Sequence, residues 1–220
     1  WYRVSPAEII NAQYVRTVAA NAPHRVRWLV DECRKRGYKR VVELGSIDGV
    51  NLFAYEQLAP EIEWHGVEVN PKGREHALKL CEETGRKPLN LHTASFDEFA
   101  ELVENENMLT GGAPIGRFDA AAVFEVLEHN YNPHPLLDAA EKCVKPGGRI
   151  YITTPNGNWS AHDEKTRVLD LRKDHVRAWT AKRMRELLET RGAKDIEVFV
   201  KENEDSFWEA NSWVCASHAV

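Results

Sequence analysis

Two carboxylates and an imidazole stand close together in the run EVLEH, which supplies Glu125, Glu128 and His129. A short helical turn here would place Glu128 three residues and His129 four residues after Glu125, on one face. Oxygen ligands favour Mg²⁺ or Mn²⁺, and the histidine also admits Zn²⁺ or Fe²⁺. A second histidine, His175, precedes a later helix pattern. These residues predict either a divalent metal site or a site shaped by Glu128 in which His129 is the general base.

A glycine-bearing turn in the run RVVELGSIDGV forms a second group of candidates. Glu43 lies near the end of an apolar stretch, and Gly45 and Gly49 bracket Ser46. Glycine permits positive φ and a close approach to a ligand. Glu68, about twenty residues further on, is placed to accept hydrogen bonds from two ribose hydroxyls. Because a carboxylate at Glu43 would repel a pyrophosphate, a positively charged nucleoside fits this group better than a dinucleotide.

Strand and helix patterns alternate along the chain, and they must position both groups. Short apolar stretches bounded by turn residues predict strands, and apolar residues three and four apart predict helices. The predicted strands are Arg40–Leu44, Glu63–Val69, Leu89–Thr93, Phe118–Phe124, Arg149–Thr153, Asp195–Val200 and Ser212–Ser217. The predicted helices are one that starts at the capping box of Ser5, then 24–36, 50–58, 72–83, 96–104, 135–144 and 180–190.

This alternation predicts an α/β fold of the Rossmann-like, doubly wound type. The sheet would have seven strands, mostly parallel with the last strand antiparallel, and helices on both faces. Ligands of such sheets bind at the carboxyl ends of the strands. Apart from His175, the candidate residues lie at such ends. We expect residues 1–38 to be helices that cover the site, and residues 39–220 to form the domain that carries it.

Composition limits the class of protein. A chain of 220 residues with 43% hydrophobic and 29% charged residues is typical of one globular domain. A formal net charge of −5 gives no support for broad binding to nucleic acid. Four scattered cysteines without a CxxC pair predict buried free thiols and a cytoplasmic location. No apolar run approaches the roughly 18–20 residues of a membrane span. The first residue is Trp1 rather than Met, which is compatible with a domain of a longer protein.

Five runs in order, VVELGSIDG, GVEVNP, TASFDEF, FDAAAVFEVLEH and KPGGRIYITTPN, resemble class I S-adenosylmethionine-dependent methyltransferases from about Arg40 to the C-terminus. The resemblance implies that S-adenosylmethionine is the cofactor. It also implies a set of residues that line the cofactor: Glu43, Gly45, Ser46 and Gly49 at the methionine and ribose part, Glu68 at the ribose hydroxyls, Ser95 and Phe96 at the adenine, and Glu125. The family often has glycine where this chain has Ile47 or Asp48, so the turn is expected to differ in shape.

The EVLEH run narrows the resemblance to two branches. Ubiquinone-biosynthesis O-methyltransferases and small-RNA 3′-terminal 2′-O-methyltransferases both carry an E-x-x-E-H run and a later histidine as metal ligands. The implied ligands here are Glu125, Glu128, His129 and His175, with Mg, Mn or Zn as the metal. We expect O-methylation of a small molecule or a glycan, with the acceptor walls formed by the loop 155–174 and by N-terminal helices that include Tyr14.

Two alternatives remain. The segment from Asp174 to Thr180 is similar to the RNA branch, whereas the net charge and the lack of an aromatic and basic stripe oppose RNA. A non-catalytic cofactor-binding domain is the other alternative. It is disfavoured because degenerate domains of this kind lose the glycine turn or the acidic ribose ligand, and this chain keeps both.

Overall fold

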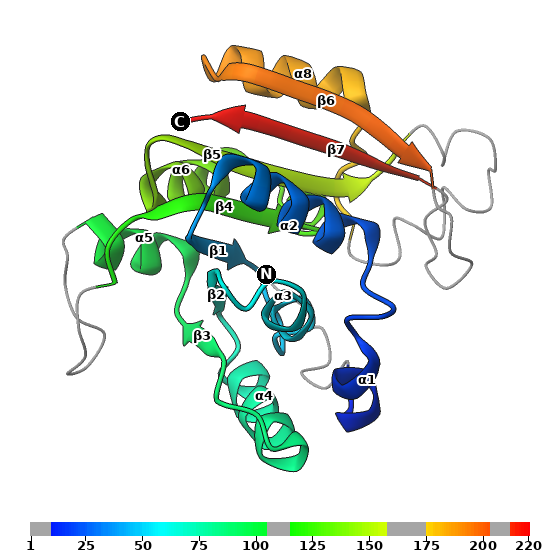
Figure 1. Ribbon diagram of the computed structural model, residues 1–220. Coiled ribbons are helices and arrows are strands. Elements are labelled where there is room, and N and C mark those ends of the chain that lie inside the picture. Colours follow the sequence, from blue (N-terminus) through cyan, green and yellow to red (C-terminus); the bar gives the residue numbers. More distant parts are fainter. Residues whose placement is uncertain (1–9, 105–114, 158–174, 203–211) are drawn as a thin grey trace.

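A seven-stranded sheet forms the centre of the protein in this computed structural model, which describes residues 10–104, 115–157, 175–202 and 212–220 (Figure 1). The strand order is β3-β2-β1-β4-β5-β7-β6. Strands β1 to β5 pair in parallel, and β7 is antiparallel to both β5 and β6. The strands are β1 (Arg40–Leu44), β2 (Glu63–Glu68), β3 (Asn90–Thr93), β4 (Phe118–Phe124), β5 (Val144–Pro155), β6 (Lys194–Glu202) and β7 (Ser212–Ala219). The predicted fold class is confirmed.

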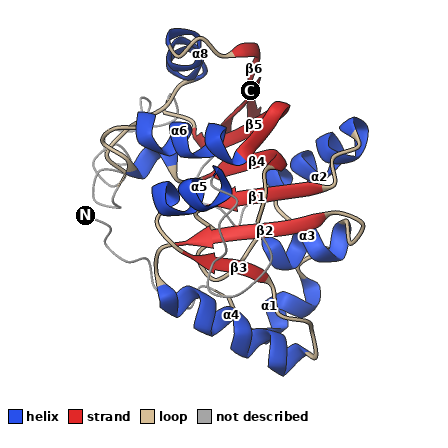
Figure 2. Ribbon diagram, turned by 90° about the vertical axis from the view of Figure 1, so that its left-hand side faces the viewer, coloured by secondary structure: helices blue, strands red, loops and turns tan. Residues whose placement is uncertain are grey.

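Helices cover both faces of this sheet. The helices are α1 (Ala12–Thr17), α2 (His24–Arg36), α3 (Leu52–Leu58), α4 (Pro71–Thr84), α5 (Phe96–Glu104), α6 (His134–Cys143) and α8 (Ala181–Thr190), with the 3₁₀ turn η1 (Leu127–His129). Figure 2 shows α5 and α6 on one side of the sheet and α2 and α3 on the other. Neighbouring residues of β1 serve the two sides, because Val41 belongs to the hydrophobic cluster of α2 and α3, and Val42 to that of α5 and α6. A strand buried on both faces is continuously apolar, as the sequence indicated.

Several boundaries differ from the predicted ones, and three of them concern the site or the sheet. Ser5 and its capping box lie outside the described residues, and α1 is instead capped by Asn11, whose side chain accepts the Tyr14 N–H at 2.9 Å. Helix α3 begins at Leu52 rather than Val50 because the turn continues through Gly49 and into Asn51. Strand β5 begins earlier than predicted, since Val144 already pairs with β4 across a register shift.

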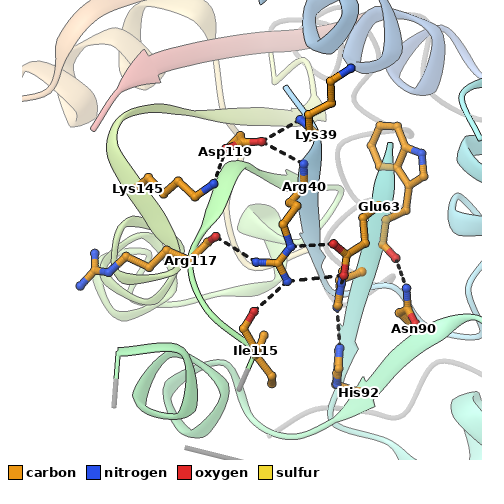
Figure 3. A network of polar contacts seen from close by, with 11 residues as sticks. Lys39, Arg40, Glu63, Asn90, His92, Ile115, Arg117, Asp119 and Lys145 are labelled. Carbon is orange, nitrogen blue, oxygen red and sulfur yellow. Dashed lines mark hydrogen bonds and ion pairs between the residues drawn. The ribbon is translucent and has the colours of Figure 1, made fainter. Parts of the chain in front are cut away.

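Ion pairs and hydrogen bonds fasten the amino ends of the central strands (Figure 3). The Arg40 guanidinium contacts the Glu63 carboxylate at 2.7 Å. The Asp119 carboxylate accepts the backbone N–H groups of Lys39 and Arg40 and pairs with Lys145 Nζ at 2.7 Å. These contacts join β1, β2, β4 and the start of β5 at the edge opposite to the carboxyl ends, where the candidate residues lie.

The cysteines are free and buried, as predicted. Burial raises the pKa of the Cys33, Cys143 and Cys215 thiols to about 12, so these side chains act as apolar packing groups. Within the described parts of the chain, no helix is both long enough and apolar enough to cross a membrane.

Candidate active site

The turn after β1 adopts the left-handed backbone that its glycines allow. Gly45 has φ 91° and Gly49 has φ 78°. A Cβ on Gly45 would lie 2.5 Å from Val126 Cγ2, and one on Gly49 would lie 2.6 Å from Leu89 Cδ1. A side chain at either position would collide with the protein itself. Glycine is therefore required at both positions even without a ligand close by.

Ile47 is the position at which this turn departs from a glycine pattern. Its φ is 52°, which is rare for a β-branched residue. A hydrogen bond and the close approach of Gly73 surround it. Its N–H donates to Glu68 Oε2 at 3.0 Å, and its carbonyl oxygen lies where a Cβ on Gly73 would come within 2.3 Å. Such strain persists only where surrounding contacts impose it.

Glu68 lies at the end of β2 beside this turn, as predicted. Its second oxygen accepts the Asn70 N–H at 2.9 Å, and burial raises its pKa. The role of Glu68 at a ribose remains a proposal.

Two other predicted cofactor residues use their hydroxyls within the protein, and a third has no polar side-chain group. The Ser46 hydroxyl is buried and donates to the Glu43 carbonyl at 3.0 Å. Ser95 caps α5, because its hydroxyl oxygen accepts the Glu98 N–H at 3.3 Å, while its own N–H and hydroxyl donate to Glu98 Oε2. Phe96 packs partly buried against the α5 and α6 side of the core. Any contact of these residues with a cofactor would therefore come from their position and not from a free hydroxyl.

Glu43 is a buried carboxylate with one oxygen unsatisfied. Its Oε1 accepts the Asn51 amide at 2.7 Å, whereas Oε2 has no hydrogen-bond partner among the described residues. Burial raises the pKa of Glu43 to about 7, against the opposing effects of Asn51, Tyr55 and the positive charge of Arg25. A buried oxygen of this kind is suited to a cationic ligand.

Arg25 is a candidate site residue that the sequence prediction missed. This arginine of α2 is buried, and its charge lowers the pKa of Glu43, Glu125 and Glu128. The guanidinium therefore lies among carboxylates that come from two different strand ends. A signal was present, because Arg25 stands four residues before Leu29, on the apolar face of α2 rather than on its charged face.

Glu125 does not belong to the group of converging ligand atoms among the described residues, although its charge reaches Glu128. Its φ is 56° and the 3₁₀ turn begins only at Leu127, so the expected helical face from Glu125 to His129 is wrong. The Glu125 carboxylate accepts the Thr153 hydroxyl at 2.8 Å and the Trp213 indole N–H at 3.1 Å. These two donors fix it on the wall formed by β5 and β7.

The remaining three predicted ligands do come together. Glu128, His129 and His175 each offer a ligand atom, and these atoms all lie within 4.8 Å of one another. The two imidazole rings are 4.8 Å apart in an edge-to-face arrangement. The segment after His175 is held in place because Val176 N–H and Arg177 N–H both donate to the Glu128 carbonyl.

Glu128 supplies the buried carboxylate of this group. It is 2% exposed, and its Oε2 accepts the Thr154 hydroxyl at 3.2 Å. Burial, and then the charge of Glu125, raise its pKa well above the ordinary value. A nearby cation would stabilise its ionised form. One carboxylate and two imidazoles form a donor set that suits divalent transition metals and Zn²⁺.

The residues around the turn fit S-adenosylmethionine. Glu43 and Arg25 provide opposite charges for an ammonium and a carboxylate, which are the two ends of an amino acid. Glu68 stands at the neighbouring strand end, where a ribose would follow. A dinucleotide, with its negatively charged phosphates, is not needed to account for this arrangement of charges.

Comparisons with known proteins agree with this fit. A family model described as a methyltransferase domain matches residues 14–198. The ubiquinone biosynthesis O-methyltransferase of Dechloromonas aromatica is 29% identical over 136 residues, which are 62% of this chain and 52% of the relative. The mitochondrial ubiquinone biosynthesis O-methyltransferase of Dictyostelium discoideum is 37% identical over 78 residues, which are 36% of this chain and 21% of the relative. This chain thus spans about half the length of the first relative and about a fifth of the length of the second.

Solved structures share the fold. The methyltransferase domain of the bacterial protein CtHen1 superposes with a TM-score of 0.60 at 19% identity, covering 96% of this chain and 100% of that one. The plantazolicin methyltransferase BpumL, in complex with a desmethylPZN analog and SAH, superposes with a TM-score of 0.61 at 13% identity, covering 94% and 93%. Because the matched residues include strands β1 to β5, the glycine turn and the EVLEH run, the chain contains a methyltransferase domain of the class I, S-adenosylmethionine-dependent family.

Proposed function

We propose that this enzyme methylates a hydroxyl oxygen that binds beside Glu128, His129 and His175. The observation that carries the proposal is the convergence of one ligand atom from each of these side chains within 4.8 Å. S-adenosylmethionine supplies a methyl group on a positively charged sulfur, and the acceptor must lose a proton to complete the transfer. The protein therefore has to align the acceptor and take up that proton.

These three residues would hold a divalent ion, with Mg, Mn or Zn as candidates. When bound, such an ion lowers the pKa of a coordinated hydroxyl and orients it. In the absence of an ion, His129 would take the proton, because its side chain is 35% exposed and is open to an acceptor. Glu128 would then stabilise the imidazolium from 3.9 Å.

The cofactor would lie between the glycine turn and this group. Glu43 and Arg25 would bind the ammonium and the carboxylate of its amino-acid end, and Glu68 would bind the ribose hydroxyls. Glu125, fixed by Thr153 and Trp213, would form the wall between the cofactor and the acceptor. Loss of the positive charge on sulfur during transfer requires no further charged partner.

The acceptor is proposed to be a hydroxyl of a small molecule or a glycan. Relatives named as ubiquinone biosynthesis O-methyltransferases support a small-molecule acceptor, whereas the likeness to the bacterial CtHen1 domain is a likeness of fold. Most of the loop that was expected to form the acceptor wall, residues 158–174, lies outside the described residues.

A chelator experiment tests the proposal. Methyl transfer to a catechol, a monophenol, a sugar and a short RNA is measured with EDTA and after addition of Mg²⁺, Mn²⁺ or Zn²⁺. His129→Ala and His175→Ala are expected to reduce turnover at least tenfold, and His134→Ala, an exposed histidine on α6, serves as the control. Calorimetry with Mn²⁺ should show binding to the wild type and not to His175→Ala. Unchanged turnover in both EDTA and His129→Ala would refute the metal and the general-base forms alike.

A further inference from the structure

Tyr14 carries a buried polar group that the proposed reaction does not use. This tyrosine of α1 is half-buried, and its hydroxyl oxygen has no hydrogen-bond partner among the described residues. Buried hydroxyls in native proteins are usually paired, so an unpaired one calls for an explanation. A ligand that enters beside the hydroxyl is one such explanation.

Two hydrogen bonds fasten α1 and the residues just before it to the elements that form the cofactor turn. Asp48, inside the turn, accepts the Ile10 N–H at 3.3 Å and contacts His76 of α4 at 3.1 Å. Gln57 of α3 donates to the Val15 carbonyl at 2.9 Å. Helix α1 is therefore held against the turn and against α3, which follows the turn.

The charges that act on Tyr14 are those of the proposed amino-acid subsite. Burial raises the pKa of Tyr14 most strongly, Arg25 lowers it, and Asp48 and Glu43 raise it. The phenol thus lies within the electrostatic reach of the same arginine and glutamate that were assigned to the two ends of an amino acid. It stays protonated at neutral pH and can donate a hydrogen bond.

We propose that the Tyr14 hydroxyl binds the amino-acid end of S-adenosylmethionine, as a hydrogen-bond donor to its carboxylate beside Arg25. The inference rests on the assignment of Glu43 and Arg25 to that end of the cofactor. It moves Tyr14 from the acceptor wall, where the sequence placed it, to the cofactor. Helix α1 would then order the cofactor site by contributing a ligand to it.

Calorimetry with Tyr14→Phe and two ligands tests this role. S-adenosylhomocysteine contains the amino-acid end, whereas 5′-methylthioadenosine keeps the nucleoside and sulfur but lacks it. Tyr14→Phe is expected to weaken binding of S-adenosylhomocysteine about tenfold, the effect of about 1.4 kcal/mol, and to leave binding of methylthioadenosine unchanged. The unfolding temperature of the ligand-free variant should be equal to or higher than that of the wild type, because the hydroxyl has no partner to lose.

Tyr151→Phe is the matched control. Its hydroxyl is also buried without a hydrogen-bond partner in the described residues, but the charged and polar groups that act on it include Arg36 and Tyr38, around the C-terminal end of α2. This variant should bind S-adenosylhomocysteine like the wild type. Equal affinity of Tyr14→Phe and the wild type for S-adenosylhomocysteine would overturn the role of Tyr14 but not the cofactor assignment. An equal loss of affinity for S-adenosylhomocysteine and methylthioadenosine would do the same. Failure of the wild type to bind S-adenosylhomocysteine would overturn the cofactor assignment as well.

Discussion

Replacing Glu43 by glutamine should stabilise the ligand-free protein at alkaline pH while weakening cofactor binding. Glutamine has nearly the shape of glutamate and still offers an oxygen to the Asn51 amide, which now bonds Glu43 Oε1. The substitution removes only the charge that burial disfavours. If the charge of Glu43 attracts the ammonium group of the cofactor, that charge serves binding and lowers the stability of the folded protein.

The magnitude follows from the pKa of Glu43, which is about 7 in the folded protein against an ordinary value of 4.5. Because the folded protein keeps a proton that the unfolded chain releases, stability is full below about pH 4.5 and falls as the pH rises through about 7. At 1.36 kcal/mol per pKa unit, the loss at pH 8 is about 3 kcal/mol. For a chain of this size, Glu43→Gln should therefore unfold roughly 6–12 °C above the wild type at pH 8. Most of this difference should disappear at pH 5, where the wild-type side chain is neutral.

Thermal unfolding at pH 5 and pH 8 measures the stability, and calorimetry with S-adenosylhomocysteine measures the binding. The affinity of Glu43→Gln is expected to fall at least tenfold at pH 8, since a hydrogen bond to a charged group is worth about 1.5–3 kcal/mol. Glu75→Gln, an exposed change on α4, is the control for the loss of one negative charge. The reasoning fails if Glu43→Gln is no more stable than the wild type at pH 8, or if its stability has the same pH dependence. Tight binding of S-adenosylhomocysteine by Glu43→Gln would instead show that Glu43 is not part of the cofactor site.

Two further substitutions test the shape of the turn. Ile47→Gly should be more stable in urea than Ile47→Ala by about 1 kcal/mol, the reverse of the order at ordinary positions, because only glycine accepts φ 52° without strain; equal stabilities would mean that the left-handed backbone is absent in solution. Gly73→Ala should lower both the unfolding temperature and the affinity for S-adenosylhomocysteine, because its Cβ would meet the Ile47 carbonyl at 2.3 Å and push α4 away from the turn. A gain in stability, as is usual when alanine replaces glycine within a helix, would refute that contact.

The sequence by itself determined the order of strands and helices and the edge at which the site lies. A short apolar run such as that of β4 indicates a strand that is buried on both faces, and it can be recognised from neighbouring residues in the sequence alone. The same local pattern placed Glu43, Glu68 and the EVLEH run at carboxyl ends of parallel strands, where ligands of such sheets bind. His175 was paired with that run by resemblance, and the structure brings it to Glu128 and His129.

Only the tertiary structure decided which side chains face one another. Ser46 and Ser95 were expected to serve the cofactor, but their hydroxyls bond to the chain itself. Glu125 does not lie on the expected helical face, because its backbone is left-handed and its carboxylate is held by residues of β5 and β7 that are distant in sequence. Arg25 and Tyr14, which we propose belong to the cofactor site, lie on helices that the sequence could not orient. The physical reason is the same in each case: periodicity fixes which residues of an element are buried, whereas the partner of a buried polar group depends on contacts between segments that are far apart in the chain.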